Sequence, residues 1–318
     1  MTSALTGWAF APVSTEPYDP RWRPASWLDA DWASGDVQIA PTRGAVLAWN
    51  AVTPPGAAIL FEIAARIEGA WSPWTPMGEW GEAPPVAQPD GPVRRNLDVA
   101  TWEKPADAIR VRGRRLPARN GALADVRRVI IACDAPAAQE PCPGPPAPGP
   151  TVFPIPFRSQ MDEPPELAPR VCGPTSLAMH LAPALPGLRT ADVAAAAFDA
   201  RHDIYGNWAH LAAVASEHGF AAWIERHACL SEVEARLLAG YGAILSIAYE
   251  EGELAGSPIP RTDGHLLVLR GWDDRGDPVL NDPAFPDRRG DGVVYRRSEF
   301  ERVWGGHGGA TILLRPER

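Results

Sequence analysis

Cysteine, histidine and aspartate residues that could together carry out nucleophilic catalysis lie in the second half of this 318-residue sequence. Cys172 comes directly before Gly-Pro and an apolar run, "GPTSLAMHLA", so we predict that it lies at the start of a helix. The free N–H groups and the dipole of a helix N-terminus lower the pKa of a thiol, and the thiolate is the nucleophile. The competing interpretation is a buried cysteine that packs as a small hydrophobic residue.

His265 is the histidine best placed to act as a base for such a thiol. It follows the flexible segment "RTDG" and opens an apolar run, "HLLVLRGW", that is typical of a strand. The next expected strand, "PVLN", ends at Asn281 and Asp282. Two adjacent antiparallel strands would bring these residues to one end of a sheet, where a carboxylate orients the imidazole and stabilises the imidazolium. The alternative for Asp282 is an Asx residue that ends a strand before Pro283.

Gln160 precedes Cys172 by twelve residues and is a candidate oxyanion donor. A side-chain amide near the nucleophile can donate a hydrogen bond to the oxyanion of a tetrahedral intermediate, together with the backbone N–H of Cys172. A glutamine in a loop carries no such information by itself. The hypothesis rests on its position upstream of the cysteine.

The elements expected around these residues are helices first and a run of strands last, which is an α+β pattern. Thr190, Asn207, Ser231 and Ser298 are expected as helix N-caps, and Glu234 and Glu301 complete capping boxes with the two serines. Strands are expected in "FAAWIER", "AILSIAY", "HLLVLRGW", "PVLND", "VVYRR" and "ATILLR".

The first part of the chain, from about Asp36 to Ala132, is strand-like and predicts an all-β sandwich of about a hundred residues. Short apolar or alternating runs are separated there by turn signals such as "TPPG" and "ARNG". Nine of the thirteen tryptophans lie before residue 103. They can form a carbohydrate- or wall-polymer-binding face, or they can pack in the core and anchor loops.

A proline-rich segment separates the two parts. Nine prolines occur between Ala135 and Pro156, and such a run forms neither a helix nor a central strand. We therefore predict a stiff linker or a strap between domains. The predicted organisation is a Trp-rich β-sandwich accessory domain over residues 1–135, a linker over 136–151 and a catalytic domain over 152–318.

Composition excludes several classes of function. The formal net charge of −9, with no basic stripe, argues against nucleic-acid binding. No apolar stretch approaches the roughly 20 residues of a membrane span. No secretory signal is visible at the N-terminus, so we expect a cytoplasmic protein, or an exported one if a leader is missing from this numbering.

The four cysteines are too few for a disulfide framework, and no metal-binding spacing accompanies them. Cys133 and Cys142 are close enough in sequence to pair, but we interpret both as unpaired thiols. Cys229 has no helix start directly after it and is interpreted as an ordinary buried thiol. We therefore expect neither a metal ion nor a cofactor.

The order Gln160, "CGPTS" at Cys172, His265 and "NDP" at Asn281 resembles the papain-like C39 peptidase family, in particular its C39-like branch. The resemblance covers about residues 152 to 315 and implies a papain-like α+β fold. By matched position it implies Cys172 as nucleophile, His265 as base, Asp282 as orienting acid and Gln160 as oxyanion donor. The β-sandwich is similar to accessory domains of some C39-like proteins.

The segment "GNW" also matches the family pattern, so we expect Asn207 and Trp208, with Gly173, to form substrate-binding positions near the cleft. The implied function is a cysteine peptidase that hydrolyses peptide bonds through an acyl-enzyme, without metal or cofactor. Peptides or cell-wall peptides are the expected substrates, and a monomer is expected. The alternatives are an amidase or acyltransferase acting on cell-wall peptides, and an inactive papain-like module whose β-sandwich binds carbohydrate or protein.

Overall fold

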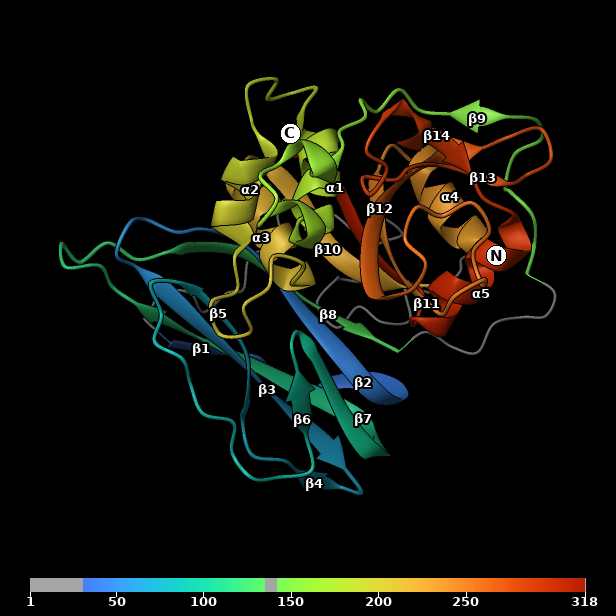
Figure 1. Ribbon diagram of the computed structural model, residues 1–318. Helices are drawn as coiled ribbons and strands as arrows, with labels where there is room; N and C mark the ends of the chain where they lie inside the picture. Colours follow the sequence, from blue (N-terminus) through green and yellow to red (C-terminus); the bar gives the residue numbers. More distant parts are fainter. Residues whose placement is uncertain (1–30, 135–141, 318) are drawn as a thin grey trace.

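Two antiparallel sheets organise the chain in a computed structural model that describes residues 31–134 and 142–317 (Figure 1). The first sheet contains β1 (Asp31–Ala33), β2 (Val37–Val52), β3 (Ala58–Ile67), β4 (Ala70–Trp71), β5 (Thr75–Gly81), β6 (Arg94–Asn96), β7 (Val99–Leu116) and β8 (Asp125–Cys133). The second contains β9 (Thr151–Val152), β10 (Phe220–Arg226), β11 (Gly242–Tyr249), β12 (Thr262–Trp272), β13 (Pro278–Asn281), β14 (Asp291–Val294) and β15 (Ala310–Pro316).

The helices all belong to the second half of the described chain. They are the 3-10 turns η1 (Gln160–Asp162), η2 (Ala168–Arg170) and η3 (Arg288–Gly290), and the α-helices α1 (Cys172–Leu181), α2 (Thr190–Ala197), α3 (Trp208–Glu217), α4 (Leu230–Leu238) and α5 (Arg297–Gly306). Helix α1 packs on β12 and α3 on β10, while α4 and α5 pack on β11. The predicted succession of helices and strands is therefore found in this half.

The first sheet is antiparallel as expected, but its strands form one continuous hydrogen-bonded sheet in place of the two sheets of a sandwich. The long strands β2 and β7 explain this difference. Strand β7 pairs with β2 through residues 99–109 and with β3 through residues 106–116, so it joins neighbours on both of its edges. Irregularities in β2 around Thr42 shift the register, and such bulges bend a strand.

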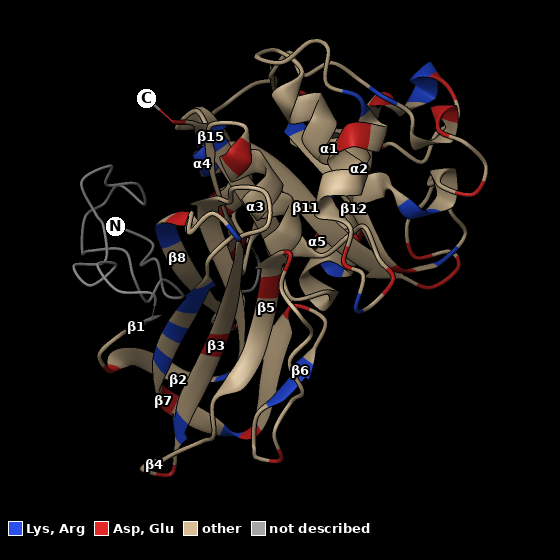
Figure 2. Cartoon of the chain, turned by 90° about the vertical axis from the view of Figure 1, so that its left-hand side faces the viewer, with Lys and Arg blue, Asp and Glu red and all other residues tan. Residues whose placement is uncertain are grey.

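The tryptophans of the first sheet pack inside it or lie against arginines. The buried rings are Trp49, Trp80 and Trp102, and the partly buried Trp71 and Trp74 lie under the guanidinium groups of Arg110 and Arg112. These two arginines of β7 also pair with carboxylates of neighbouring segments. Figure 2 shows basic and acidic positions on neighbouring strands of this sheet. An exposed aromatic face is therefore absent among the described residues from Trp49 to Trp102. Trp8, Trp22 and Trp27 lie outside the described residues.

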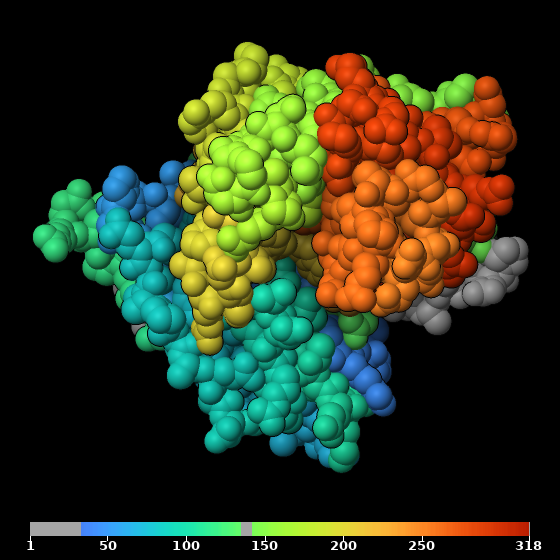
Figure 3. All heavy atoms as spheres, in the orientation of Figure 1, coloured from blue at the N-terminus to red at the C-terminus, as the bar shows by residue number. Residues whose placement is uncertain are grey.

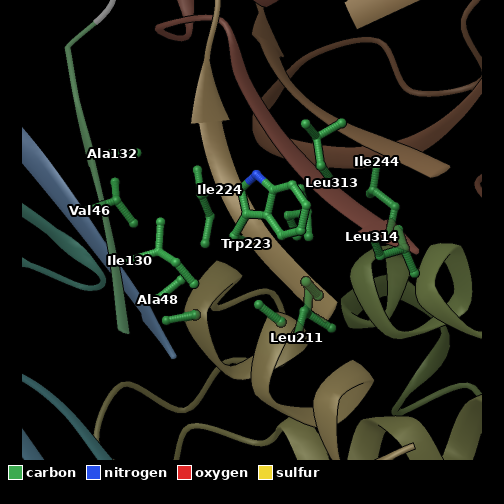
Figure 4. Packing of buried hydrophobic residues seen from close by; sticks show 14 of the residues in the cluster. Val46, Ala48, Ile130, Ala132, Leu211, Trp223, Ile224, Ile244, Leu313 and Leu314 are labelled. Atoms are coloured by element: carbon green, nitrogen blue, oxygen red, sulfur yellow. The ribbon is translucent and has the colours of Figure 1, made fainter. Parts of the chain in front are cut away.

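The two sheets share one hydrophobic core. Val46 and Ala48 of β2 and Ile130 of β8 face Ile224 of β10 and Leu211 of α3 (Figure 4).

A buried polar contact crosses the same interface. The Asn50 Nδ2 group donates to the Ala222 carbonyl oxygen at 2.6 Å, and the Ala222 N–H donates to Asn50 Oδ1 at 3.3 Å. A second link is the ion pair between Arg127 and Glu317 at 2.7 Å. A large apolar interface with satisfied polar groups holds the first sheet in a fixed position against the second half.

The prediction that Cys142 and Cys229 are unpaired thiols is wrong, because they form a disulfide with a Cα–Cα distance of 5.5 Å. Cys133 and Cys172 are the free cysteines among the described residues. The pairing joins the proline-rich segment to the N-cap of α4 across 87 residues, a distance at which sequence spacing gives no signal. The described part of that segment is also tied down by β9, which pairs with β12.

The N-cap residues predicted from the sequence are confirmed only in part. Asn207 caps α3 as predicted, with its Oδ1 accepting from the His210 N–H at 3.2 Å. Thr190 and Ser231 instead lie inside helices, whose N-caps are Arg189 and Cys229. Ser298 likewise lies inside α5, after the N-cap Arg296. The predicted capping partner of Ser298, Glu301, accepts from the Leu230 N–H of α4 at 3.3 Å, so a tertiary contact replaces the local capping box.

Candidate active site

Cys172 is the first residue of α1, as its Gly-Pro context predicted. The Ser176 hydroxyl of the same helix donates to the Leu266 carbonyl oxygen at 3.0 Å, which fixes α1 against β12 next to His265. The Cys172 sulfur is partly buried and lies within hydrogen-bond reach of His265 and of the backbone N–H groups of Gly173 and Leu266. A helix start and a strand therefore jointly surround one sulfur atom with donors.

His265 lies on β12, and Asp282 directly follows the neighbouring antiparallel strand β13; the register of the two strands pairs Val268 with Asn281. Both side chains are buried, and the His265 Nε2 atom is 2.8 Å from Asp282 Oδ1. Because Nε2 is occupied by the carboxylate, Nδ1 is the ring atom left for the contact with Cys172. The structure thus places His265 between Asp282, to which it is hydrogen-bonded, and Cys172, whose thiol pKa it lowers.

Tyr295 is a part of this arrangement that the sequence did not point to. Its hydroxyl donates to Asp282 Oδ2 at 2.7 Å, while the Ala284 N–H donates to Oδ1 at 3.0 Å. The buried Tyr295 ring stacks on Phe300 of α5, with 6.2 Å between the ring centroids. Asp282 is therefore held at both oxygens, which fixes the orientation it gives to His265.

The pKa values of the Cys172 thiol and of His265 move in opposite directions. Burial raises the pKa of the Cys172 thiol, but hydrogen bonding and the charge of His265 outweigh burial, so the net pKa is lowered. Burial lowers the pKa of His265, but the charge and hydrogen bond of Asp282 outweigh it and raise the pKa to about 10. A lowered thiol pKa beside a raised imidazole pKa favours a thiolate–imidazolium pair.

Gln160 is buried in η1, next to the turn that follows Asp282. Its backbone N–H donates to the Pro283 carbonyl oxygen at 2.8 Å, and its Nε2 donates to the Ala168 carbonyl oxygen at 2.7 Å. A carbonyl oxygen only accepts, so the Ala168 contact fixes which end of the amide is nitrogen. Ala168 begins η2, which leads into Cys172, and an amide nitrogen has a second N–H to offer.

A cleft of about 490 Å³ opens at Cys172, and both halves of the chain line it. Asn207 and Trp208 are among the residues that line it, and their role in binding substrate stays a prediction. Gly173, the third predicted substrate-binding residue, is instead buried, and a Cβ there would lie 2.8 Å from side-chain atoms of Leu211 and Leu266. The role left for Gly173 is close packing and the N–H that it directs at the Cys172 sulfur.

Another part of the lining of the cleft comes from the first sheet, which the sequence did not predict. The turn Asn96–Val99, between β6 and β7, lines the same cleft as Cys172. In Figure 3 the teal surface of this sheet lies directly against the yellow and orange surface of the second half.

A second cavity of about 520 Å³, lined by residues of β5, α2 and α3, does not include Cys172 among its lining residues. Within residues 31–134 and 142–317, no group of three or more His, Cys, Asp or Glu residues has the arrangement of a metal site. The helices of the same ranges are all too short or too polar to cross a membrane.

Comparison with known proteins identifies both halves of the chain. The model of the Peptidase C39 like family matches residues 152–312, and the model of a Peptidase C39 N-terminal domain matches residues 5–112. These matches confirm the resemblance found in the sequence. No curated protein matches the chain.

Two solved structures match about half of the chain. A protein assigned as a C39-like peptidase from Bacillus anthracis is 19% identical, with a TM-score of 0.39, over 53% of this chain and 99% of that one. A double-glycine-motif protease from an AMS/PCAT transporter, solved with its leader peptide, is 22% identical, with a TM-score of 0.34, over 52% of this chain and 97% of that one.

Proposed function

The chain belongs to the Peptidase C39 like family, and we propose that it is a cysteine peptidase that hydrolyses peptide bonds through Cys172, His265 and Asp282. The observation that supports this proposal is the position of His265 between Asp282, 2.8 Å away, and Cys172, whose thiol pKa it lowers. The position of Cys172 at a helix start and the opposite pKa shifts of Cys172 and His265 favour a thiolate at neutral pH, against the effect of burial.

In the proposed reaction the Cys172 thiolate attacks the carbonyl carbon of the scissile bond and forms a tetrahedral intermediate. The Nδ1–H of the His265 imidazolium protonates the leaving amine, and an acyl-enzyme remains on the sulfur. His265, now neutral, then takes a proton from a water molecule that attacks the thioester and releases the acid. Asp282 stays ionised throughout and stabilises the imidazolium.

The oxyanion of each tetrahedral intermediate requires donors beside Cys172. We assign this role to the second Nε2–H of Gln160 and the backbone N–H of Cys172. What supports the assignment is the fixed orientation of the Gln160 amide and its position next to the segment that follows Asp282. Asn207 and Trp208 form the proposed substrate wall together with the turn Asn96–Val99.

The decisive experiment measures the rate of alkylation of Cys172 against pH, by peptide mass spectrometry, in the wild type and in His265→Ala. A free thiol titrates near about pH 8.5. We expect Cys172 of the wild type to react at about pH 6 and to lose that reactivity in His265→Ala. Cys133 of the same chain is the internal control, because burial raises the pKa of that thiol to about 12.

His218→Ala is the matched histidine control, since this residue caps α3 at its C-terminal end and is not part of the arrangement at Cys172. Reaction of Cys172 only above about pH 8 in the wild type, with no effect of His265→Ala, would refute the proposal. Cleavage of a peptide panel by the wild type, lost in Cys172→Ala, then identifies the bond that is hydrolysed.

A further inference from the structure

The cleft at Cys172 is built from both halves of the chain, and this composition bears on how substrate is selected. Asn207 and Trp208, at the start of α3, line it from the second half. The turn Asn96–Val99 of the first sheet lines the same cleft next to them. Because the two sheets share a core, this turn has a defined position relative to the nucleophile.

The turn is held in a strained backbone conformation. Leu97 has a φ of 56°, in the left-handed region that a leucine rarely adopts. Its carbonyl oxygen accepts a hydrogen bond from the Arg95 guanidinium, which also pairs with Glu79 of β5 at 3.3 Å. Such conformations persist where the surrounding structure enforces them, and they cluster at sites of function.

A direct hydrogen bond fastens the same turn to the start of α3. The buried carboxylate of Asp98 accepts from the backbone N–H of Trp208, with 2.6 Å between Oδ2 and N. This N–H is the first of α3, where a helix has no acceptor of its own, so Asp98 supplies one from the other half of the chain. The two parts of the lining are therefore joined to each other beside the nucleophile.

We propose that the turn Asn96–Val99 is a specificity-determining wall of the substrate cleft and that the Leu97 side chain contacts the bound peptide. Asp98 is a positioning residue, which holds the turn against Trp208. Leu97 is only partly buried and lines the cleft, so its apolar side chain offers a contact surface to an apolar substrate residue near the scissile bond. The inference depends on the proposed function for the reaction itself. The selectivity of that reaction for its substrate is what we assign to this turn.

Leu97→Gly is the variant that tests the proposal with the least disturbance of the fold, because glycine adopts a positive φ without strain. Leu123→Gly is the matched control, since Leu123 is an exposed leucine in a loop of the first sheet that does not line the cleft. The substrate is an equimolar octapeptide library whose cleavage sites are read by mass spectrometry.

We expect Leu97→Gly to lower kcat/KM at least about 10-fold, mainly through KM, for peptides with a large apolar residue at one fixed position from the cleaved bond. This is the loss of about 1.4 kcal/mol of contact with the substrate. For peptides with a small residue at that position, we expect Leu97→Gly and the wild type to have the same kcat/KM. The rate of Cys172 alkylation by iodoacetamide, a reagent too small to need the wall, stays unchanged. Cleavage preferences identical in the wild type, Leu97→Gly and Leu123→Gly would overturn the proposal.

A binding measurement separates this proposal from the proposed function. Octapeptides retained by Cys172→Ala and by Cys172→Ala/Leu97→Gly are compared by affinity selection from the same library. Retention that depends on Leu97 supports the wall even where Cys172 of the wild type proves unreactive, in which case only the proposed function fails. A reactive Cys172 together with retention that is independent of Leu97, or with no retention by either variant, leaves the proposed function standing and refutes the wall.

Discussion

At the scale of single residues, the reactivity of the site depends on how charge is distributed between Cys172, His265 and Asp282. His265 is buried yet its pKa is raised to about 10, because Asp282 lies 2.8 Å from it. The thiolate and the imidazolium stabilise each other, so each alone would be unfavourable at such a buried position. Removing either partner therefore alters the protonation of the other.

Among the residues outside this trio, Tyr295 is the one whose substitution has the clearest expected effect on the activity. Tyr295→Phe removes the hydrogen bond to Asp282 Oδ2 but keeps the ring that stacks on Phe300. Loss of a hydrogen bond to a charged group costs about 1.5 kcal/mol. If this cost falls on the transition state, kcat/KM decreases roughly 10-fold. Because the carboxylate then has one donor fewer, its negative charge stabilises the imidazolium more strongly, and the alkaline limb of the pH–rate profile should move to higher pH.

The measurement is the pH dependence of kcat/KM, or of Cys172 alkylation, with Tyr249→Phe as the control. The Tyr249 hydroxyl donates to the Ile259 carbonyl oxygen and lies beside Ser257 rather than donating to Asp282. An unchanged alkaline limb in Tyr295→Phe would show that the hydroxyl does not tune His265.

At the scale of elements, the contact between the turn Asn96–Val99 and the start of α3 should depend on pH. Burial raises the pKa of Asp98 to about 6, although the Trp208 N–H and the charges of Arg95 and Arg226 act against this rise. A folded-state pKa above the unfolded value of about 3.9 means that the folded chain binds the proton more tightly. The contribution of Asp98 to the free energy of unfolding is therefore largest below about pH 4 and falls as pH rises through about 6.

Asp98→Asn keeps a hydrogen-bond acceptor for the Trp208 N–H and removes the titration. A shift of about two pKa units corresponds to about 3 kcal/mol. When the pH is raised from 4 to 8, the free energy of unfolding of the variant should therefore rise by about that much relative to that of the wild type. Urea unfolding of both proteins at the two pH values measures the difference, and effects common to both chains cancel. Asp125→Asn, at an exposed position in β8, is the control. A difference between wild type and variant that is constant with pH would contradict the assignment.

At the scale of the whole molecule, the shared core predicts that the two sheets unfold together. Leu211 and Ile224 are fully or almost fully buried, and they face residues of β2 and β8 (Figure 4). Loss of the first sheet would expose them to water, at a cost of about 25 cal/mol per Å² of apolar surface. Calorimetry of the full chain should therefore give one transition whose van't Hoff and calorimetric enthalpies agree. Two separated transitions would show independent domains.

The disulfide between Cys142 and Cys229 is expected to stabilise the folded chain as well. Cross-linking residues that are 87 apart restricts the unfolded chain, and its removal should lower the free energy of unfolding by about 2–4 kcal/mol. The test compares urea unfolding of the wild type with that of Cys142→Ser/Cys229→Ser. The Cys133→Ser variant, which removes a free buried thiol, controls for the loss of a cysteine. Equal stability of the wild type and the double variant would show that the bridge contributes nothing.

Much of the fold of the second half was predictable from its sequence, because its signals are local. Apolar runs marked the strands, and β10 spans the same residues as the predicted "FAAWIER". Two of the helix starts show the limit of such signals. Cys229 and Arg296 became N-caps in place of Ser231 and Ser298, because contacts with distant residues replaced the local ones. The boundaries proposed at residues 135 and 152 stay a prediction.

The sequence by itself determined the candidates for chemistry. Cys172 was expected at a helix start. His265 lies on β12 and Asp282 directly follows β13, so strand order and turn signals were enough to predict that these two residues lie close together. Only the tertiary structure decided that Tyr295 holds Asp282, that Cys142 pairs with Cys229, and that the turn at Leu97 lines the cleft. These contacts join segments through a shared core, and the sequence pattern of a segment records which face is buried but not which distant segment buries it.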